Sequence, residues 1–178
     1  MNQPTDAHLE ALQQQTRSVY QRHAAAWDHQ RSQHQMEQKW LDRAQSHVQP
    51  PGPVLDVGCG TGAPIAAYFI ERNYSIVGVD FAPAMLDVAR RRWPEHWWLE
   101  VDMRTLALDQ VFGAVVAWNS FFHLNAEEQR RVLPLLSAHV APGGILLLTI
   151  GDRAGEVVGT VMGDAVYHAS LHPDEYRA

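Results

Sequence analysis

The first quarter of the chain is polar but carries apolar residues at the spacing of a helix. Steps of mostly three or four residues join Leu9, Leu12, Thr16, Val19, Tyr20, His23 and Trp27. A second helical set is formed by Met36, Trp40, Ala44 and Val48. The prolines of 50-PPGP-53 then end helical structure, because proline lacks the backbone donor. We therefore expect residues 1–49 to form a helical N-terminal cover.

From Val54 onward, short apolar runs alternate with helical stretches. The runs predict strands at 54–57, 75–79, 97–101, 111–118 and 145–150, with a turn at 141–144. Pro64, Pro83 and Asn125 mark the starts of the intervening helices. Near-continuous apolar strands separated by helices are typical of a parallel sheet covered on both faces. The sequence thus predicts a doubly wound, mostly parallel α/β domain over residues 50–178, which forms one structural domain with the helical extension.

The last part of the chain is harder to interpret. Residues 155–171 fit either a turn-linked pair of short strands or an irregular cover. A helix that starts at His172 would have only about six residues, which is too few to be stable in isolation. The pattern predicts that the chain stops inside a structural element, so we expect a C-terminal truncation.

The composition narrows the class of protein. Of the 178 residues, 46% are hydrophobic and 19% charged, and the net charge is −6, which fits a globular acidic protein. The longest apolar runs fall short of the ~18–20 residues of a membrane span, and the N-terminus has no apolar signal segment. The single cysteine excludes an intrachain disulfide, and the lack of a long basic run argues against nucleic-acid binding. We expect a cytoplasmic protein.

A glycine-rich segment, 54-VLDVGCGTGAP-64, joins the first strand to the first helix. Ligands of open α/β sheets bind at the carboxyl ends of the strands, although such glycines can also make only a tight turn. The pattern also fits a dinucleotide fingerprint, with Asp80 about 20 residues on. Asp56 would repel a pyrophosphate, whereas S-adenosylmethionine carries a sulfonium and an ammonium against one carboxylate. The charges favour S-adenosylmethionine, and a NAD(P)-dependent oxidoreductase is an alternative.

Five segments in order resemble the successive motifs of class I S-adenosylmethionine-dependent methyltransferases. They are Val54–Pro64, 77-VGVDFAPAML-86, 100-EVDM-103, 112-FGAVVAWNSFFHL-124 and 141-APGGILLLTIG-151. The resemblance covers roughly residues 50–151 and implies a Rossmann-like fold. It also implies a cofactor site formed by Tyr20, Asp56, Gly58, Cys59, Gly60, Gly62, Asp80, Phe81, Met85, Asp102, Met103, Asn119 and Ser120.

The resemblance assigns roles within this set. Asp56 lies near the ammonium group, and Asp80 accepts hydrogen bonds from the ribose hydroxyls. Phe81 and Met85 pack on the adenine, and Asp102 accepts from its amino group. Each assignment has a simpler alternative. A carboxylate after a strand often does no more than cap the next turn, and a methionine on a helix can be a core residue.

The resemblance also implies methyl transfer to a small-molecule acceptor by direct in-line displacement, with S-adenosylhomocysteine as product. Asn119-Ser120-Phe121-Phe122 lacks the Asn-Pro-Pro-Tyr run of amino-directed relatives, which argues against nucleobase and protein amide acceptors. His123, just past the fourth strand, is a candidate general base, although packing or capping also explains it. The histidines do not have the spacing of metal ligands, so no metal site is expected.

One alternative to an active enzyme, and one expectation about assembly, follow from the expected truncation. Class I relatives usually end with two further strands, and this sequence does not show both of them. A protein that binds S-adenosylmethionine without turnover is therefore an alternative. A missing pair of strands would also leave the fifth strand uncovered, and we expect a homo-oligomer through this exposed sheet edge.

Overall fold

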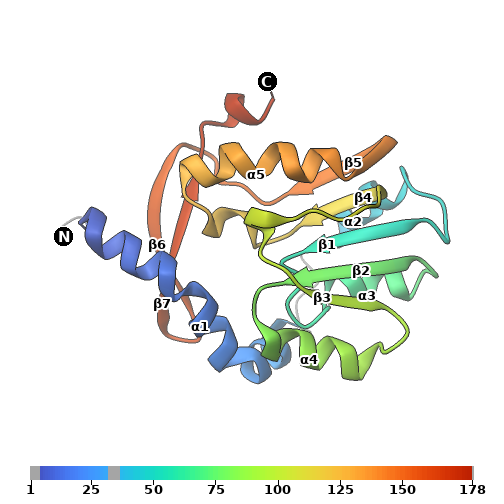
Figure 1. Ribbon diagram of the computed structural model, residues 1–178, viewed down its shortest axis with the longest axis horizontal. Coiled ribbons are helices and arrows are strands. Elements are labelled where there is room, and N and C mark those ends of the chain that lie inside the picture. Colours follow the sequence, from blue (N-terminus) through green and yellow to red (C-terminus); the bar gives the residue numbers. More distant parts are fainter. Residues whose placement is uncertain (1–4, 32–36, 178) are drawn as a thin grey trace.

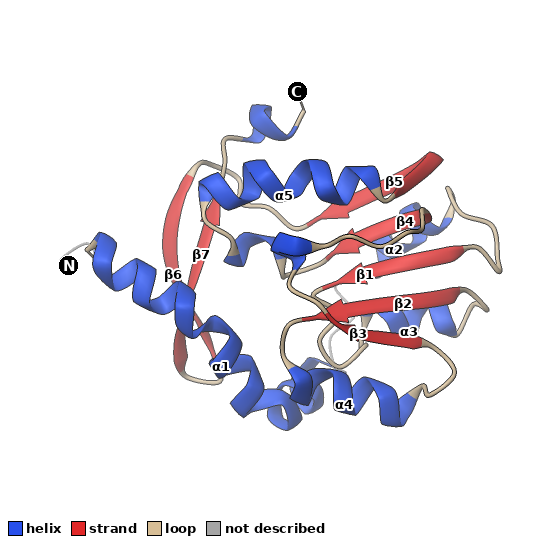
Figure 2. Cartoon of the chain, in the orientation of Figure 1, coloured by secondary structure: helices blue, strands red, loops and turns tan. Residues whose placement is uncertain are grey.

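The computed structural model describes residues 5–31 and 37–177 and shows a five-stranded parallel sheet with helices on both faces (Figures 1 and 2). The strands lie in the order β3-β2-β1-β4-β5 and are β1 (Pro53–Val57), β2 (Ser75–Asp80), β3 (Trp97–Glu100), β4 (Phe112–Ala117) and β5 (Val140–Leu148). The order reverses at β1 and β4, where ligands bind in doubly wound sheets. The predicted fold class is confirmed.

The helices follow the predicted positions. They are α1 (Asp6–Arg31), α2 (Gln38–Gln45), α3 (Ile65–Ile70), α4 (Pro83–Arg92) and α5 (Ala126–Ala138), with short 3-10 turns η1 (Met103–Thr105), η2 (Phe121–His123) and η3 (Pro173–Tyr176). Asn125 caps α5, because its side chain accepts from the backbone N–H of Glu128 and the Glu128 carboxylate accepts from the backbone N–H of Asn125. Met36, predicted in the second helix, lies outside the described residues.

The side chains of the sheet alternate between two hydrophobic cores. Val54, Ala114 and Val116 pack with α2, α3 and α4 on one face, while Leu55 and Val115 pack with α5 on the other. Burial on both faces explains why the strands read as continuous apolar runs. The long helix α1 packs against α4 and β7 and so crosses the carboxyl ends of the strands.

The predicted turn at 141–144 is wrong, because these residues lie within β5. Phe112 pairs with Val140 and Ala114 pairs with Ile145, so four residues of β5 stand opposite Gly113 alone. The glycines and proline therefore form a bulge in a strand that begins directly after α5.

Residues 155–170 form the turn-linked pair of strands, which was one of the two predicted possibilities. β6 (Gly155–Val161) and β7 (Asp164–Ser170) are antiparallel and make a separate two-stranded sheet. This hairpin lies beside α1 and not along β5 (Figure 1). Among the described residues, no strand pairs with the outer edge of β5.

Candidate functional site

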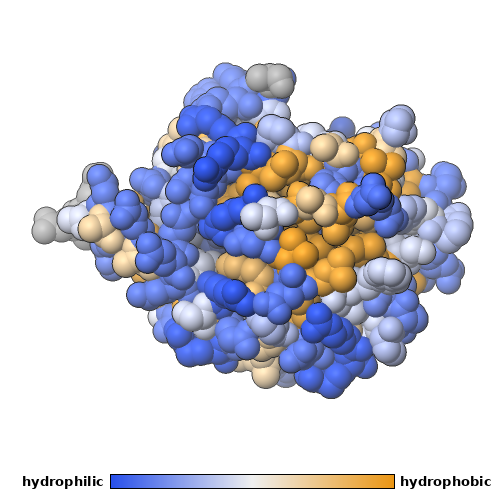
Figure 3. Space-filling model, viewed as in Figure 1, coloured by the Kyte–Doolittle hydropathy of each residue, from blue (hydrophilic) through white to orange (hydrophobic). Residues whose placement is uncertain are grey.

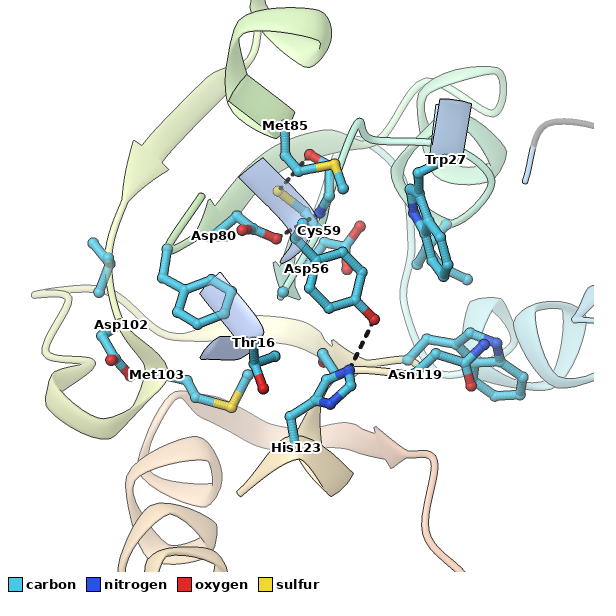
Figure 4. Close-up of a pocket in the computed structure, with 18 of the residues that line it drawn as sticks. Thr16, Trp27, Asp56, Cys59, Asp80, Met85, Asp102, Met103, Asn119 and His123 are labelled. Atoms are coloured by element: carbon cyan, nitrogen blue, oxygen red, sulfur yellow. Dashed lines mark hydrogen bonds between the residues drawn. The ribbon is translucent and has the colours of Figure 1, made fainter. Parts of the chain in front are cut away.

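A cavity with about 870 Å³ of empty space, part of it open to solvent, lies at the carboxyl ends of β1, β2 and β4. The predicted site residues that line it are Tyr20, Asp56, Gly58, Cys59, Gly60, Asp80, Phe81, Met85, Asp102, Met103, Asn119, Ser120 and His123. Figure 4 shows that Asp56, Asp80, Met85, Asp102, Asn119 and His123 surround one space. The structure therefore brings together residues from five separate segments.

Gly62 is the one predicted site residue that does not line the cavity. It has a φ of +82°, and a Cβ atom on it would lie 2.6 Å from the ring of Trp93 and 2.9 Å from that of Trp98. Gly62 thus allows the loop to pack against these indoles, and its predicted contact with the cofactor does not fit this position.

The glycine loop after β1 is packed closely against the loop after β4. A Cβ atom on Gly58 would lie 2.3 Å from Cβ of Ser120, while one on Gly60 would meet nothing closer than 3.7 Å. Ser120 also donates from Oγ to the carbonyl oxygen of Val57 at 2.6 Å. The loop after β1 is therefore held against the loop after β4, with Gly60 facing open space in the cavity.

Asp56 is a buried carboxylate with an unsatisfied oxygen. It is 1% exposed, and its Oδ2 has no hydrogen-bond partner within the described part of the chain. Burial and the charge of Asp80 raise its pKa to about 8, although a hydrogen bond from the backbone of Ala66 lowers it. Such a group is satisfied by a cation or by hydrogen-bond donors.

Asp80 ends β2 and accepts two backbone hydrogen bonds. The N–H of Gly60 donates to Oδ2 at 2.9 Å, and the N–H of Ala82 donates to Oδ1 at 2.8 Å. Burial raises its pKa to about 6, and the two backbone donors lower it. Asp80 does cap the next turn, as the simpler interpretation expected, and it also faces the cavity.

Asp102 is more exposed than the other two carboxylates. It accepts from the backbone N–H of Arg104 at 2.9 Å and pairs with the guanidinium of the same residue at 3.1 Å. Arg104 also donates from Nε to Glu128 at 2.6 Å. The positive charge of Arg104 is thus shared between two carboxylates at this end of the cavity.

The last turns of α1 form the opposite wall. The rings of Tyr20 and Trp27 meet edge to face with centroids 5.3 Å apart, and the Arg31 guanidinium lies 5.8 Å from the Trp27 ring. Arg31 donates from Nη2 to the buried Glu37 at 2.7 Å. Sequence reasoning missed Arg31. Thr16, Tyr20, Trp27 and Arg31 lie at steps of four, seven and four residues, and this shared helix face was the signal for it.

Trp118 and Asn119 complete the cavity at the end of β4. Trp118 donates from Nε1 to Glu37 at 3.2 Å, and Asn119 has a φ of +52°, a conformation that asparagine tolerates better than most residues. The Asn119 backbone N–H donates to Oγ1 of Thr149 at 3.1 Å. Trp118 was not predicted as a site residue, because it reads as the last apolar residue of a buried strand.

Both ring nitrogens of His123 are occupied. Nε2 lies 2.8 Å from Oη of Tyr20, the bond that ends on His123 in Figure 4, and Nδ1 lies 2.9 Å from the carbonyl oxygen of Tyr167 on β7. Burial lowers the pKa of His123 to about 4, so the ring is neutral at neutral pH. No lone pair of His123 is free for a substrate proton while Tyr20 stays bound.

Comparison with known proteins identifies the family. The family model described as methyltransferase domain matches residues 54–144, which run from β1 to the bulge of β5. The chain is 32% identical over 152 residues to a malonyl-[acyl-carrier protein] O-methyltransferase of Serratia marcescens, covering 82% of this chain and 56% of the relative. The chain belongs to the methyltransferase domain family.

Other members of this methyltransferase family differ in their acceptors. The chain is 30% identical over 109 residues to dTDP-3-amino-3,4,6-trideoxy-alpha-D-glucopyranose N,N-dimethyltransferase of Streptomyces venezuelae, covering 60% of this chain and 46% of the relative. It spans about half the length of these curated relatives.

Solved structures show the same methyltransferase fold. CalS10 from Micromonospora echinaspora, an amino pentose methyltransferase solved with S-adenosylmethionine, aligns with a TM-score of 0.61 and 23% identity over 99% of this chain and 87% of that chain. The glycopeptide N-methyltransferase MtfA, solved with S-adenosylhomocysteine, aligns with a TM-score of 0.61 and 19% identity over 80% of this chain and 76% of that chain.

The described residues contain neither a membrane-spanning helix nor a cluster of metal ligands. No helix there is both long enough and apolar enough to cross a membrane. In the same residues, no three His, Cys, Asp or Glu side chains gather as metal ligands would.

Proposed function

We propose that this chain binds S-adenosylmethionine and transfers its methyl group to a small-molecule acceptor. The observation that carries the proposal is the unpartnered, buried oxygen of Asp56, which lines the cavity beside the glycine loop. Asp80 lies close enough to raise the pKa of Asp56, so two carboxylates meet where a dinucleotide would place its pyrophosphate. A cationic ligand can replace the proton of Asp56 and pair with the carboxylate, whereas a pyrophosphate would meet the negative charge of Asp80, so the site supports a cationic ligand and argues against NAD(P).

The residues present fit S-adenosylmethionine from end to end. Asp56 would bind its ammonium group, and Asp80, which already caps Gly60 and Ala82, would bind the ribose hydroxyls. Phe81, Met85, Asp102 and Met103 would hold the adenine, as the sequence implied. Arg31 is the cation at the other end of the cavity, and we assign it to the carboxylate of the cofactor.

The bound cofactor supplies an activated methyl group on a sulfonium. The protein then has to orient the reactants and exclude water, and helix α1 does both by crossing the cavity with Tyr20 and Trp27. His123 does not serve as the base in this account, because both of its nitrogens are engaged.

We also propose the route of the acceptor. A second, open hollow between the end of α1 and the turn of β6 and β7 is lined by Gln30, Thr160, Val161, Met162 and Gly163. It shares Trp27 and Arg31 with the main cavity, so the two spaces meet at these side chains. Relatives named for trans-aconitate and for a dTDP-linked amino sugar support a small molecule here.

Asp56→Asn tests the proposal most specifically. The variant should lose most of its affinity for S-adenosylhomocysteine, because the amide no longer attracts the ammonium group. If the site held a dinucleotide, the same variant should bind NADH more tightly than the wild type above pH 8, where Asp56 is ionised and its charge would repel the pyrophosphate. Calorimetry with both ligands on both proteins separates these outcomes, and tighter NADH binding would refute the proposal.

A further inference from the structure

The hydrogen bonds of His123 define which atom carries each proton. The carbonyl oxygen of Tyr167 can only accept, so His123 Nδ1, at 2.9 Å, must carry a hydrogen. Because the buried ring is neutral, Nε2 has no hydrogen and accepts one. The hydroxyl of Tyr20, at 2.8 Å, is therefore the donor.

This arrangement limits what Tyr20 can offer to the cavity. Tyr20 donates its one hydroxyl proton to His123. A ligand in the cavity can therefore contact only the lone pairs of the phenolic oxygen. Tyr20 lines the same cavity as Asp80 and Arg31, which are assigned to the ribose and to the carboxylate of the cofactor. The sulfonium of S-adenosylmethionine joins the ribose to the amino-acid part, so it is expected in this same space.

We infer that Tyr20 presents an oxygen lone pair to the sulfonium of the bound cofactor, and that His123 is a positioning residue that keeps the Tyr20 proton away from it. The inference rests on the proposed function. A lone pair attracts the positive sulfur and its polarised methyl hydrogens, whereas an O–H aimed at them would repel the charge. Contacts of this C–H···O kind contribute about 0.5–1 kcal/mol.

The three groups come from distant parts of the chain. Tyr20 belongs to α1, His123 to η2 and Tyr167 to β7, so the bonds join the N-terminal cover to the β6–β7 hairpin across the end of the sheet. His123 is packed between the rings of Tyr20 and His168, with centroids 5.4 and 4.9 Å away. The ring is thereby held in the orientation that fixes both protons.

The test compares two ligands that differ only by the charged methyl group. Tyr20→Phe should weaken S-adenosylmethionine about two- to fivefold and leave S-adenosylhomocysteine within twofold, as measured by calorimetry. Tyr74→Phe is the matched control, because this buried tyrosine donates to the Val48 carbonyl outside the cavity and should leave both affinities unchanged. Equal weakening of both ligands, or of neither, by Tyr20→Phe would overturn the inference.

Variants of His123 test its role as the positioning residue. His123→Leu removes both bonds and should shift the ratio of the two affinities as Tyr20→Phe does. His123→Gln retains one donor and one acceptor and should restore most of the wild-type ratio. If His123→Leu shifts the ratio of the two affinities and His123→Gln does not restore it, His123 is not a positioning residue for Tyr20.

Nuclear magnetic resonance of the wild-type protein without ligand tests the tautomer of His123 directly. The nitrogen chemical shifts of His123 should show a protonated Nδ1 and an unprotonated Nε2 between pH 5 and 8. The opposite tautomer would overturn the inference while leaving the proposed function intact. If the wild type shows the expected tautomer but binds neither sulfur ligand, the proposed function fails, and the inference fails with it.

Discussion

The backbone N–H of Gly60 donates to the carboxylate of Asp80 at 2.9 Å, which ties the loop after β1 to the end of β2. The other oxygen of Asp80 accepts from Ala82 at the start of α4. One buried side chain therefore fixes the glycine loop and the next strand–helix turn relative to each other. The same side chain is the one assigned to the ribose.

Replacing Asp80 by asparagine should weaken S-adenosylhomocysteine by about 10- to 100-fold, because the amide cannot accept from both backbone donors and both ribose hydroxyls. Asp87→Asn is the control, since this exposed carboxylate on α4 pairs with Arg90 and the variant should bind the ligand normally. Calorimetry measures both. An unchanged affinity of the Asp80 variant would remove the ribose assignment.

The ligand-free protein should be less stable at higher pH because of Asp56. Its pKa is about 8 in the folded protein against an ordinary 3.8, so from pH 4 to 8 the folded state holds a proton that the unfolded state has lost. The free energy of unfolding therefore falls as the pH rises through this window. Asp56→Asn should raise the melting temperature by roughly 5 °C at pH 8 and much less at pH 4.5.

Melting curves of both proteins at the two pH values check this prediction. Asp152→Asn, at an exposed carboxylate that does not line the cavity, is the control and should have the melting temperature of the wild type at both pH values. A gain for Asp56→Asn that is as large at pH 4.5 as at pH 8 would show that the ionisation of Asp56 is not its cause.

Arg31→Gln should weaken S-adenosylhomocysteine about tenfold, because the loss of a charged hydrogen bond costs roughly 1.5 kcal/mol. Methylthioadenosine, which lacks the amino-acid part, should bind this variant as it binds the wild type. Arg22→Gln is the matched control, since this arginine of α1 pairs with Asp164 on the outside. Equal weakening of both ligands would mean that Arg31 supports the cavity without contacting the carboxylate.

The fold could be predicted from the sequence because each strand is buried on both faces. Val54, Leu55 and Val115 must all find apolar partners, and only a covered parallel sheet provides them. The bulge of β5 could not be predicted, since a proline followed by two glycines also fits a turn. Residues 155–170 pair as strands that pack against α1. The local sequence pattern holds no information on this packing, so it left the pairing open.

Most of the candidate site could also be predicted, because its residues directly follow strands whose carboxyl ends meet at one edge. Asp56, Asp80 and Asn119 are of this kind. Arg31 had a signal in the helix face that it shares with Tyr20 and Trp27, but Trp118 could not be assigned, because its position depends on the buried Glu37 that it contacts. The engagement of His123 with Tyr167 joins residues 44 positions apart and leaves no local signal.

The outer edge of β5 should cause self-association, as the sequence suggested. Among the described residues this edge has no partner strand, and Leu146 and Leu148 are only partly buried. In Figure 3, apolar side chains gather on the viewed face of the molecule, over the strands between α5 and α4. Sedimentation velocity should show a sedimentation coefficient that rises with protein concentration, and a constant monomer value would contradict the prediction.

The central claim is that the cavity binds a cationic sulfur cofactor and not a dinucleotide. Titration of the purified protein with S-adenosylmethionine, S-adenosylhomocysteine and NADH in a calorimeter tests it most directly. We predict micromolar binding of the two sulfur ligands and none of NADH. Binding of NADH without either sulfur ligand would contradict the claim.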